Sequence, residues 1–132
     1  MVRFRPYYRR TDRTGGPPES GPAGARRGFG VGLATVSGPS MVPTLRSGDV
    51  VLVRYGGRPR TGGVVLARYR SLPDRLVVKR VVRADGDGWW LASDNVFAGG
   101  DSEVHGTADV LGRVVMRLRP GVPRRVGRLA SP

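Results

Sequence analysis

Short runs of β-branched and other apolar residues, separated by turn residues, occupy the middle of the chain. Gly, Pro, Asp and Ser cluster before successive runs, and the Asp-Gly-Asp-Gly turn at 85–88 predicts a hairpin. Gly112, inside the last run, indicates a β-bulge. The pattern predicts a mainly β fold, with one compact all-β domain over residues 31–119. Its expected strands are 50–54, 64–69, 75–83, 89–92 and 110–118.

The two ends of the chain lack this pattern. Residues 1–30 are rich in Arg, Gly, Pro and Ser, with neither helical nor strand periodicity, and Pro, Gly and Arg return beyond residue 120. This composition predicts a disordered basic arm over 1–30 and a disordered basic tail over 120–132.

The formal net charge of +13 lies mainly in these ends. Residues 1–30 carry +5 and residues 113–132 carry +6, whereas residues 31–112 carry only +2. The body of the domain is therefore almost neutral, and we expect no nucleic-acid partner. Such tails keep a small domain soluble, and they could also touch an anionic membrane surface.

Other features exclude whole classes of protein. No apolar stretch approaches the roughly 18 residues that cross a bilayer, and no apolar segment follows the basic start, so no secretory signal is expected. The absence of cysteine excludes disulfides, thiol nucleophiles and thiolate metal sites. We expect a cytoplasmic protein, with the tails available for peripheral membrane contact, and neither a metal nor a cofactor.

Lys79 is the only lysine, beside 22 arginines. A buried lysine can lose its proton and accept one from a hydroxyl, which arginine cannot do. Strand alternation places residues 77, 79 and 81 on one face, so that two valines flank Lys79, and places Arg80 on the opposite face. The strand alone equally allows a lysine at a sheet edge with its amine in water.

Ser40 lies in a Gly- and Pro-rich turn before the first expected strand. Such a turn suits a nucleophile, but a serine hydroxyl needs a base to become reactive. His105 is the only histidine, and a Ser–His–Asp arrangement around it is conceivable, although no carboxylate partner stands out. An ordinary loop serine is the simpler interpretation of Ser40 alone.

Four segments together resemble the motifs of the signal peptidase I family, in the same order. Residues 38–45 look like the nucleophile box, 47–53 like the Gly-Asp strand box, and 78–82 like the general-base box. Residues 93–106 are similar to the final box. The resemblance covers about residues 38–118 and implies a compact β catalytic domain of that kind.

The resemblance also implies roles for individual residues. Ser40 would attack the scissile carbonyl to form an acyl-enzyme, and Lys79 would take the serine proton and return it to the leaving amine. The backbone N–H of Ser40 would stabilise the oxyanion. Gly38 and Met41 would border the oxyanion site and substrate cleft. The residues expected to support the site are Asp94, Asn95, Asp101 and Ser102.

Four positions depart from the family pattern. Gly38 stands where many members have a serine that helps the oxyanion hole, and Gly99 where a serine often contacts the lysine amine. Glu103 replaces an arginine that usually pairs with the aspartate, and Ser93 replaces the first glycine of the final box. These changes weaken the expected supporting groups and leave both members of the dyad in place.

The expected lack of a membrane anchor separates this chain from typical signal peptidases. A compact member of this kind resembles the actinobacterial proteases that mature nickel superoxide dismutase, and the Trp89-Trp90 pair and residues 95–102 look similar to that subgroup. The partner implied is a precursor, with nickel superoxide dismutase as the expected substrate, from which a short N-terminal propeptide is removed.

Two other functions stay open. A repressor-type self-cleaving domain uses the same Ser/Lys chemistry, and Ala23-Gly24 is a candidate cleavage dipeptide 16 positions before Ser40, although no helix-turn-helix precedes it. The third hypothesis is a non-enzymatic protein that binds nucleic acid or a membrane surface through its Arg-rich tails.

Overall fold

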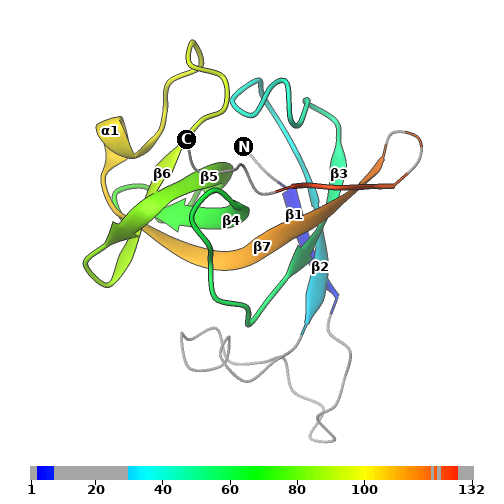
Figure 1. Ribbon diagram of the computed structural model, residues 1–132, viewed down its shortest axis with the longest axis horizontal. Helices are drawn as coiled ribbons and strands as arrows, with labels where there is room; N and C mark the ends of the chain where they lie inside the picture. The colour runs from blue at the N-terminus through cyan, green and yellow to red at the C-terminus, as the bar shows by residue number, and fades with distance from the viewer. Residues whose placement is uncertain (1–2, 8–29, 120, 122, 128–132) are drawn as a thin grey trace, which may run out of the picture.

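The strands of this protein, seen in a computed structural model that describes residues 3–7, 30–119, 121 and 123–127, form one antiparallel sheet (Figure 1). A single turn of helix, α1 (Ser102–His105), lies between β6 and β7 in this described part of the chain. The strands are β1 (Arg3–Tyr7), β2 (Val31–Thr35), β3 (Val50–Arg54), β4 (Val64–Tyr69), β5 (Leu76–Asp85), β6 (Gly88–Ala92), β7 (Ala108–Arg119) and β8 (Arg124–Arg125).

The predicted mainly β fold is confirmed. Strands β3 and β4 begin and end at the predicted residues, and β6 and β7 extend beyond the predicted runs. Strand β5 begins at Leu76, just after the predicted start, and continues past the predicted end to Asp85. The Asp-Gly-Asp-Gly segment forms the predicted hairpin, because Asp85 pairs with Gly88 across a two-residue turn. Runs of β-branched and other apolar residues bounded by turn residues were therefore sufficient to locate the central strands.

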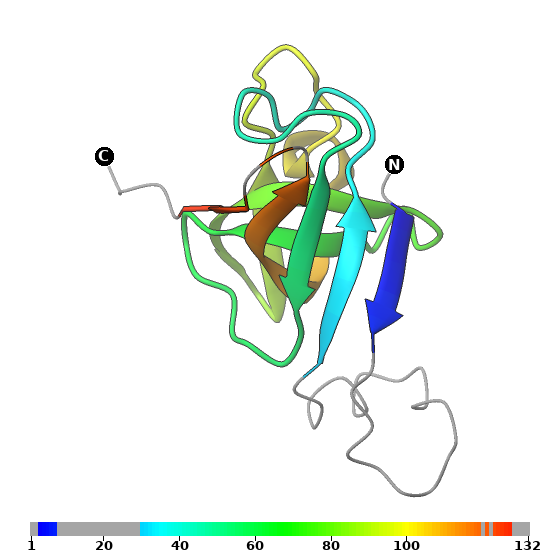
Figure 2. The same cartoon turned by 90° about the vertical axis from the view of Figure 1, so that its right-hand side faces the viewer.

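Strand β7 is the longest of these strands and connects the two halves of the sheet. The sheet order is β1-β2-β3-β7-β4-β5-β6, with β8 on β7. The first part of β7 pairs with β4 and the later part with β3. One further pairing, between Trp89 of β6 and Ala108 of β7, brings the β4–β6 side back against β7. Figure 2 shows β1, β2 and β3 side by side along the other half.

Gly112 allows β7 to pass close to β3. The register shifts beside it: Leu66 pairs with Gly112 and Ala67 with Val110, which leaves one extra residue between them on β7. A Cβ at position 112 would lie 2.6 Å from Val53 Cγ1 and 2.9 Å from the Arg54 carbonyl oxygen, so only glycine fits without displacing β3. The bulge predicted at this glycine is present.

Two apolar clusters lie on opposite sides of β4 and β5. One includes Met41, Val51, Leu66 and Val78, and the other includes Val65, Tyr69, Val81 and Leu91. Neighbouring residues of β4 and β5 belong to different clusters, so both faces of these strands are covered. As a consequence, consecutive side chains along β5 are buried, including those that carry charge.

The structure corrects the prediction of disorder for part of each end of the chain. Arg3–Tyr7, expected within a disordered arm, form β1 and pair with β2, and Arg124–Arg125 of the expected tail pair with β7. Backbone hydrogen bonds to an exposed strand edge require no apolar periodicity, so the side-chain pattern gave no signal for either strand. The other residues for which disorder was predicted, 1–2, 8–29, 120, 122 and 128–132, lie outside the described residues.

Within the ranges that the structure describes, no helix has the length and apolar character needed to span a membrane.

Candidate active site

One cleft brings together three segments that are distant in sequence. Its walls come from residues 36–40 before β3, from residues 77–79 of β5, and from Ala98, Gly100 and His105 in and near the loop after β6. The loops before β3 and after β6 lie at the same end of the molecule in both views (Figures 1 and 2). The cleft contains both Ser40 and Lys79.

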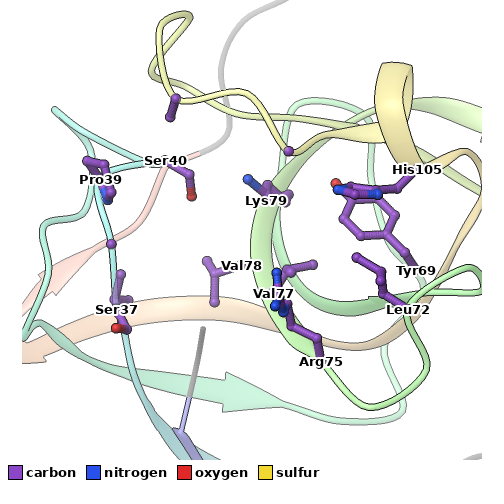
Figure 3. A pocket seen from close by; sticks show the side chains of 14 residues that line it. Ser37, Pro39, Ser40, Tyr69, Leu72, Arg75, Val77, Val78, Lys79 and His105 are labelled. Carbon is purple, nitrogen blue, oxygen red and sulfur yellow. The ribbon is translucent and has the colours of Figure 1, made fainter.

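The Lys79 amine points toward Ser40, whose side chain extends into the same cleft (Figure 3). Ser40 lies on the turn that follows β2, and Lys79 projects from the middle of β5. The structure therefore brings the two residues predicted as nucleophile and general base to facing walls of one cleft.

The loop after β6 holds the Ser40 turn in place. The backbone N–H of Asn95 donates to the Ser40 carbonyl oxygen at 2.9 Å, and the Asn95 side-chain amide donates to the Pro39 carbonyl oxygen at 3.1 Å. On the inner side, Met41 and Leu45 are fully buried, and the Leu45 N–H donates to the Met41 carbonyl oxygen at 2.8 Å. Among the described residues, no group accepts a hydrogen bond from the Ser40 N–H, which leaves it available to a substrate oxygen.

Lys79 is only 5% exposed, so the alternative of an edge lysine with its amine in water is wrong. Burial disfavours the ammonium form and lowers the pKa of Lys79, while the nearby negative charge of Asp101 opposes this effect. Its Nζ donates to Ser93 Oγ at 2.8 Å. The amine is thus desolvated, and its hydrogen-bond partner within the described ranges is one neutral hydroxyl.

Arg80 forms a buried ion pair with Asp94 on the other face of β5. The Arg80 Nη2 and Nε atoms lie 2.6 and 2.7 Å from the two carboxylate oxygens, and Nη1 donates to the Gly62 carbonyl oxygen at 2.7 Å. Thr44 of the nucleophile loop donates to the same carboxylate. Burial acts to raise the pKa of Asp94, but the Arg80 and Thr44 hydrogen bonds and the Arg80 charge hold it below its usual value.

Strand alternation predicts Arg80 on the face away from Lys79, and no function was predicted for this residue. The signal that could have identified it is the near-continuous apolar run around it, which is typical of a strand buried on both faces. A charged side chain inside such a run must be paired.

The predicted supporting residues near α1 fix the end of the cleft. Asp101 caps the helix by accepting from the Glu103 N–H at 3.2 Å. Ser102 is buried, and its Oγ accepts from the Leu91 N–H at 2.8 Å, which joins α1 to β6. Asp101 also acts at a distance, because its charge favours the protonated forms of both Lys79 and Tyr69.

The structure separates the two residues expected beside Ser40. Gly38 lines the cleft, and its N–H donates to Ser47 Oγ at 3.3 Å. Met41 does not line the cleft as expected: its side chain is fully buried in the hydrophobic core. Because neighbouring residues on a tight turn point in different directions, a turn that exposes Ser40 to the cleft directs Met41 inward.

His105 lies at the end of the cleft away from Ser40. Its ring packs against Tyr69 with centroids 5.0 Å apart, and Lys79 lies between Ser40 and this pair in Figure 3. Burial, assisted by the Asp101 charge, raises the pKa of Tyr69 and keeps it neutral. The amine that faces Ser40 therefore belongs to Lys79, and the arrangement favours a Ser/Lys pair over a Ser–His–Asp triad.

In the part of the chain that the structure describes, no group of three or more His, Asp or Glu side chains is placed to hold a metal ion.

Comparison with known proteins gives related sequences. The sequence pattern of the Peptidase S24-like family matches residues 20–115, a range that contains the Ser40 turn, β5 and the loop after β6. The chain is 30% identical over 115 aligned positions to the mitochondrial ATP-independent inner membrane protease subunit 1a of Arabidopsis thaliana, covering 64% of this chain and 68% of that protein. It is 28% identical over 116 positions to the mitochondrial inner membrane protease subunit 1 of Homo sapiens, covering 67% and 70%. The Mus musculus protein of the same name matches equally well.

Proposed function

Since the chain belongs to the Peptidase S24-like family, we propose that it is a serine endopeptidase in which Ser40 is the nucleophile and Lys79 the general base. Membership of a protease family, with relatives of the signal peptidase I type, confirms the family-level prediction made from the sequence motifs. The observation that carries the proposed mechanism is that the Ser40 hydroxyl faces a buried lysine amine across one cleft (Figure 3).

In the proposed reaction, the neutral Lys79 amine accepts the Ser40 proton as Oγ forms a bond to the scissile carbonyl carbon. The free Ser40 N–H donates to the developing oxyanion. The C–N bond then breaks as the Lys79 ammonium returns its proton to the leaving amine, which leaves an acyl-enzyme. Water attacks this ester with Lys79 again as base and releases Ser40.

Burial of Lys79 supports this assignment. A lysine with the ordinary pKa of about 10.4 is almost entirely protonated at neutral pH and cannot accept a proton. Desolvation lowers the pKa of Lys79 and increases the fraction of neutral amine. Ordinary surface lysines lack this property.

For the substrate, we propose a precursor protein that loses a short N-terminal propeptide, with the nickel superoxide dismutase precursor as the first to be tested. The support is the likeness of the Trp89-Trp90 pair and residues 95–102 to proteases of that kind, together with the processing role implied by the signal-peptidase-like motifs. A cytoplasmic location, with the Arg-rich tails in contact with precursor or membrane, belongs to the same proposal.

The test is cleavage of that precursor by the purified full chain, followed by mass spectrometry of the products, with a complex peptide library as a second substrate. Ser40→Ala and Lys79→Ala should each abolish cleavage while the thermal unfolding midpoint stays close to that of the wild type. Ser71→Ala is a matched control, because Ser71 is exposed and its hydroxyl donates to the His105 carbonyl oxygen away from the dyad. Full activity in Lys79→Ala would contradict the proposed dyad.

Self-cleavage is distinguished by incubating the chain alone at alkaline pH. The candidate dipeptide Ala23-Gly24 lies outside the described residues. If the chain keeps its full mass after prolonged incubation under conditions where the precursor is cut, it does not cleave itself. The Ser/Lys chemistry then acts on a separate substrate.

A further inference from the structure

A chain of two hydrogen bonds connects Lys79 to the loop after β6. Lys79 Nζ donates to Ser93 Oγ at 2.8 Å, and Ser93 Oγ donates to the Gly99 carbonyl oxygen at 3.2 Å. Ser93 lies at the start of this loop and Gly99 near its end. The hydroxyl of Ser93 thus bridges the buried amine and a backbone carbonyl.

The direction of these bonds matters for the chemistry of the amine. A serine hydroxyl has one proton to donate and two lone pairs to accept with. Because the Ser93 proton is directed to Gly99, Ser93 presents only lone pairs to Lys79. The lysine must then use an N–H toward Ser93, so the lone pair of its neutral form is not engaged by Ser93.

We propose that Ser93 is the positioning residue of the general base, holding the Lys79 amine so that its lone pair faces the Ser40 hydroxyl. This inference rests on the proposed function, since it concerns the orientation of the Ser/Lys dyad. Ser93 acts through Lys79, and Gly99 sets the direction of the Ser93 hydroxyl.

The two sequence departures at positions 93 and 99 are explained together. Position 99, where related proteases often carry the serine that contacts the lysine, has a backbone φ of 65°, which favours glycine. Its carbonyl oxygen meets the hydroxyl of Ser93 from the other end of the loop. The hydroxyl lost at position 99 is therefore supplied from position 93.

The first test compares Ser93→Ala, Ser93→Thr and the matched control Ser71→Ala on cleavage of the nickel superoxide dismutase precursor. Loss of the hydroxyl leaves the amine free to rotate, so Ser93→Ala should lower kcat by about 10- to 100-fold, the effect of a misplaced reacting group, with KM within about twofold. Ser93→Thr keeps a hydroxyl and should retain most of kcat, and Ser71→Ala should match the wild type. Unchanged kcat in Ser93→Ala, while Lys79→Ala is inactive, would overturn the role of Ser93 and leave the proposed function intact.

The second test needs no substrate. Because Lys79 is the only lysine, labelling with isotopic lysine gives NMR signals from this side chain alone. In the full chain, Ser93→Ala should shift the Lys79 amine signals and lower the pKa at which they titrate, since the ammonium loses a hydrogen-bond acceptor. The other titratable and charged groups around the amine, Asp101, Arg75, His105 and Tyr69, are unchanged in this variant.

Identical Lys79 titrations in the wild type and Ser93→Ala would overturn the proposal whatever the substrate is. If Ser93→Ala does not fold, Ser93→Gly, the residue usual at this position in the related proteases, is measured in the same two ways. Activity that persists in Lys79→Ala would instead contradict the proposed function, and the NMR titration would still decide whether Ser93 holds the amine.

Discussion

The guanidinium of Arg80 holds the carboxylate of Asp94 through hydrogen bonds of 2.6 and 2.7 Å, one residue along β5 from the amine that faces Ser40. Thr44 donates to the same carboxylate. This buried pair therefore joins three parts of the site: the strand that carries Lys79, the loop that carries Ser93, and the turn that carries Ser40.

Removal of one member of this pair should destabilise the whole domain. Arg80→Ala leaves the Asp94 carboxylate buried without its counter-charge, a change that typically costs about 3–5 kcal/mol in the free energy of unfolding. Urea or thermal unfolding checks this value. The exposed pair of Arg70 with Asp87 and Asp109 provides the control, and Arg70→Ala should leave the midpoint almost unchanged. Equal effects of the two substitutions would contradict the structural role of Arg80.

The activity should increase with pH as Lys79 loses its proton, with this transition below the ordinary lysine pKa of about 10.4 because burial lowers the pKa of Lys79. Asp101 favours the ammonium, so Asp101→Asn should move the transition to lower pH, while asparagine can still cap α1. Tyr69, His105 and Arg75, which also line the cleft, are unchanged in this variant.

The pH dependence of kcat/KM measures this shift. Asp109→Asn removes an equal charge from the exposed pair with Arg70 and should leave the transition where it is in the wild type. A transition that stays in place or moves upward in Asp101→Asn would show that Asp101 does not favour the Lys79 ammonium through its charge.

Asn95 should affect activity through the position of the Ser40 turn. Asn95→Asp keeps the oxygen that accepts from the Phe97 N–H but loses the donor to the Pro39 carbonyl. Loss of a neutral hydrogen bond costs about 0.5–1.5 kcal/mol, and the aspartate oxygen also repels the Pro39 carbonyl oxygen, so kcat/KM should fall by at least about 3- to 10-fold. Kinetics at a temperature where both proteins are folded test this, and an unchanged kcat/KM would show that the backbone bond from Asn95 to Ser40 is sufficient.

Gly112→Ala should destabilise the junction between the two halves of the sheet. The added Cβ would clash with Val53 and with the Arg54 carbonyl, and overpacking of this kind costs about 1–3 kcal/mol. Thermal unfolding checks the loss. Gly127→Ala is the control, because a Cβ at position 127 meets no atom within 4 Å, and its midpoint should remain close to that of the wild type.

The sequence determined the central strands and the hairpin, and it predicted the proposed pair of reactive residues. Apolar runs and turn residues are local properties, so they located β3 and β4 at their observed bounds. Strand alternation is also local, and it put Val77, Lys79 and Val81 on one face. The order of four motifs predicted Ser40 and Lys79 as a pair without any knowledge of the distance between them.

Only the tertiary structure decided what surrounds those residues. Alternation along one strand does not reveal which other segments cover its two faces, so neither Asp94 as the partner of Arg80 nor the burial of Met41 in the core could be predicted. The hydrogen bonds from Lys79 to Ser93 and from Ser93 to Gly99 depend on how the loop after β6 folds over β5. Such contacts between distant segments arise from packing of the whole sheet, whereas the strand pattern depends on each segment alone.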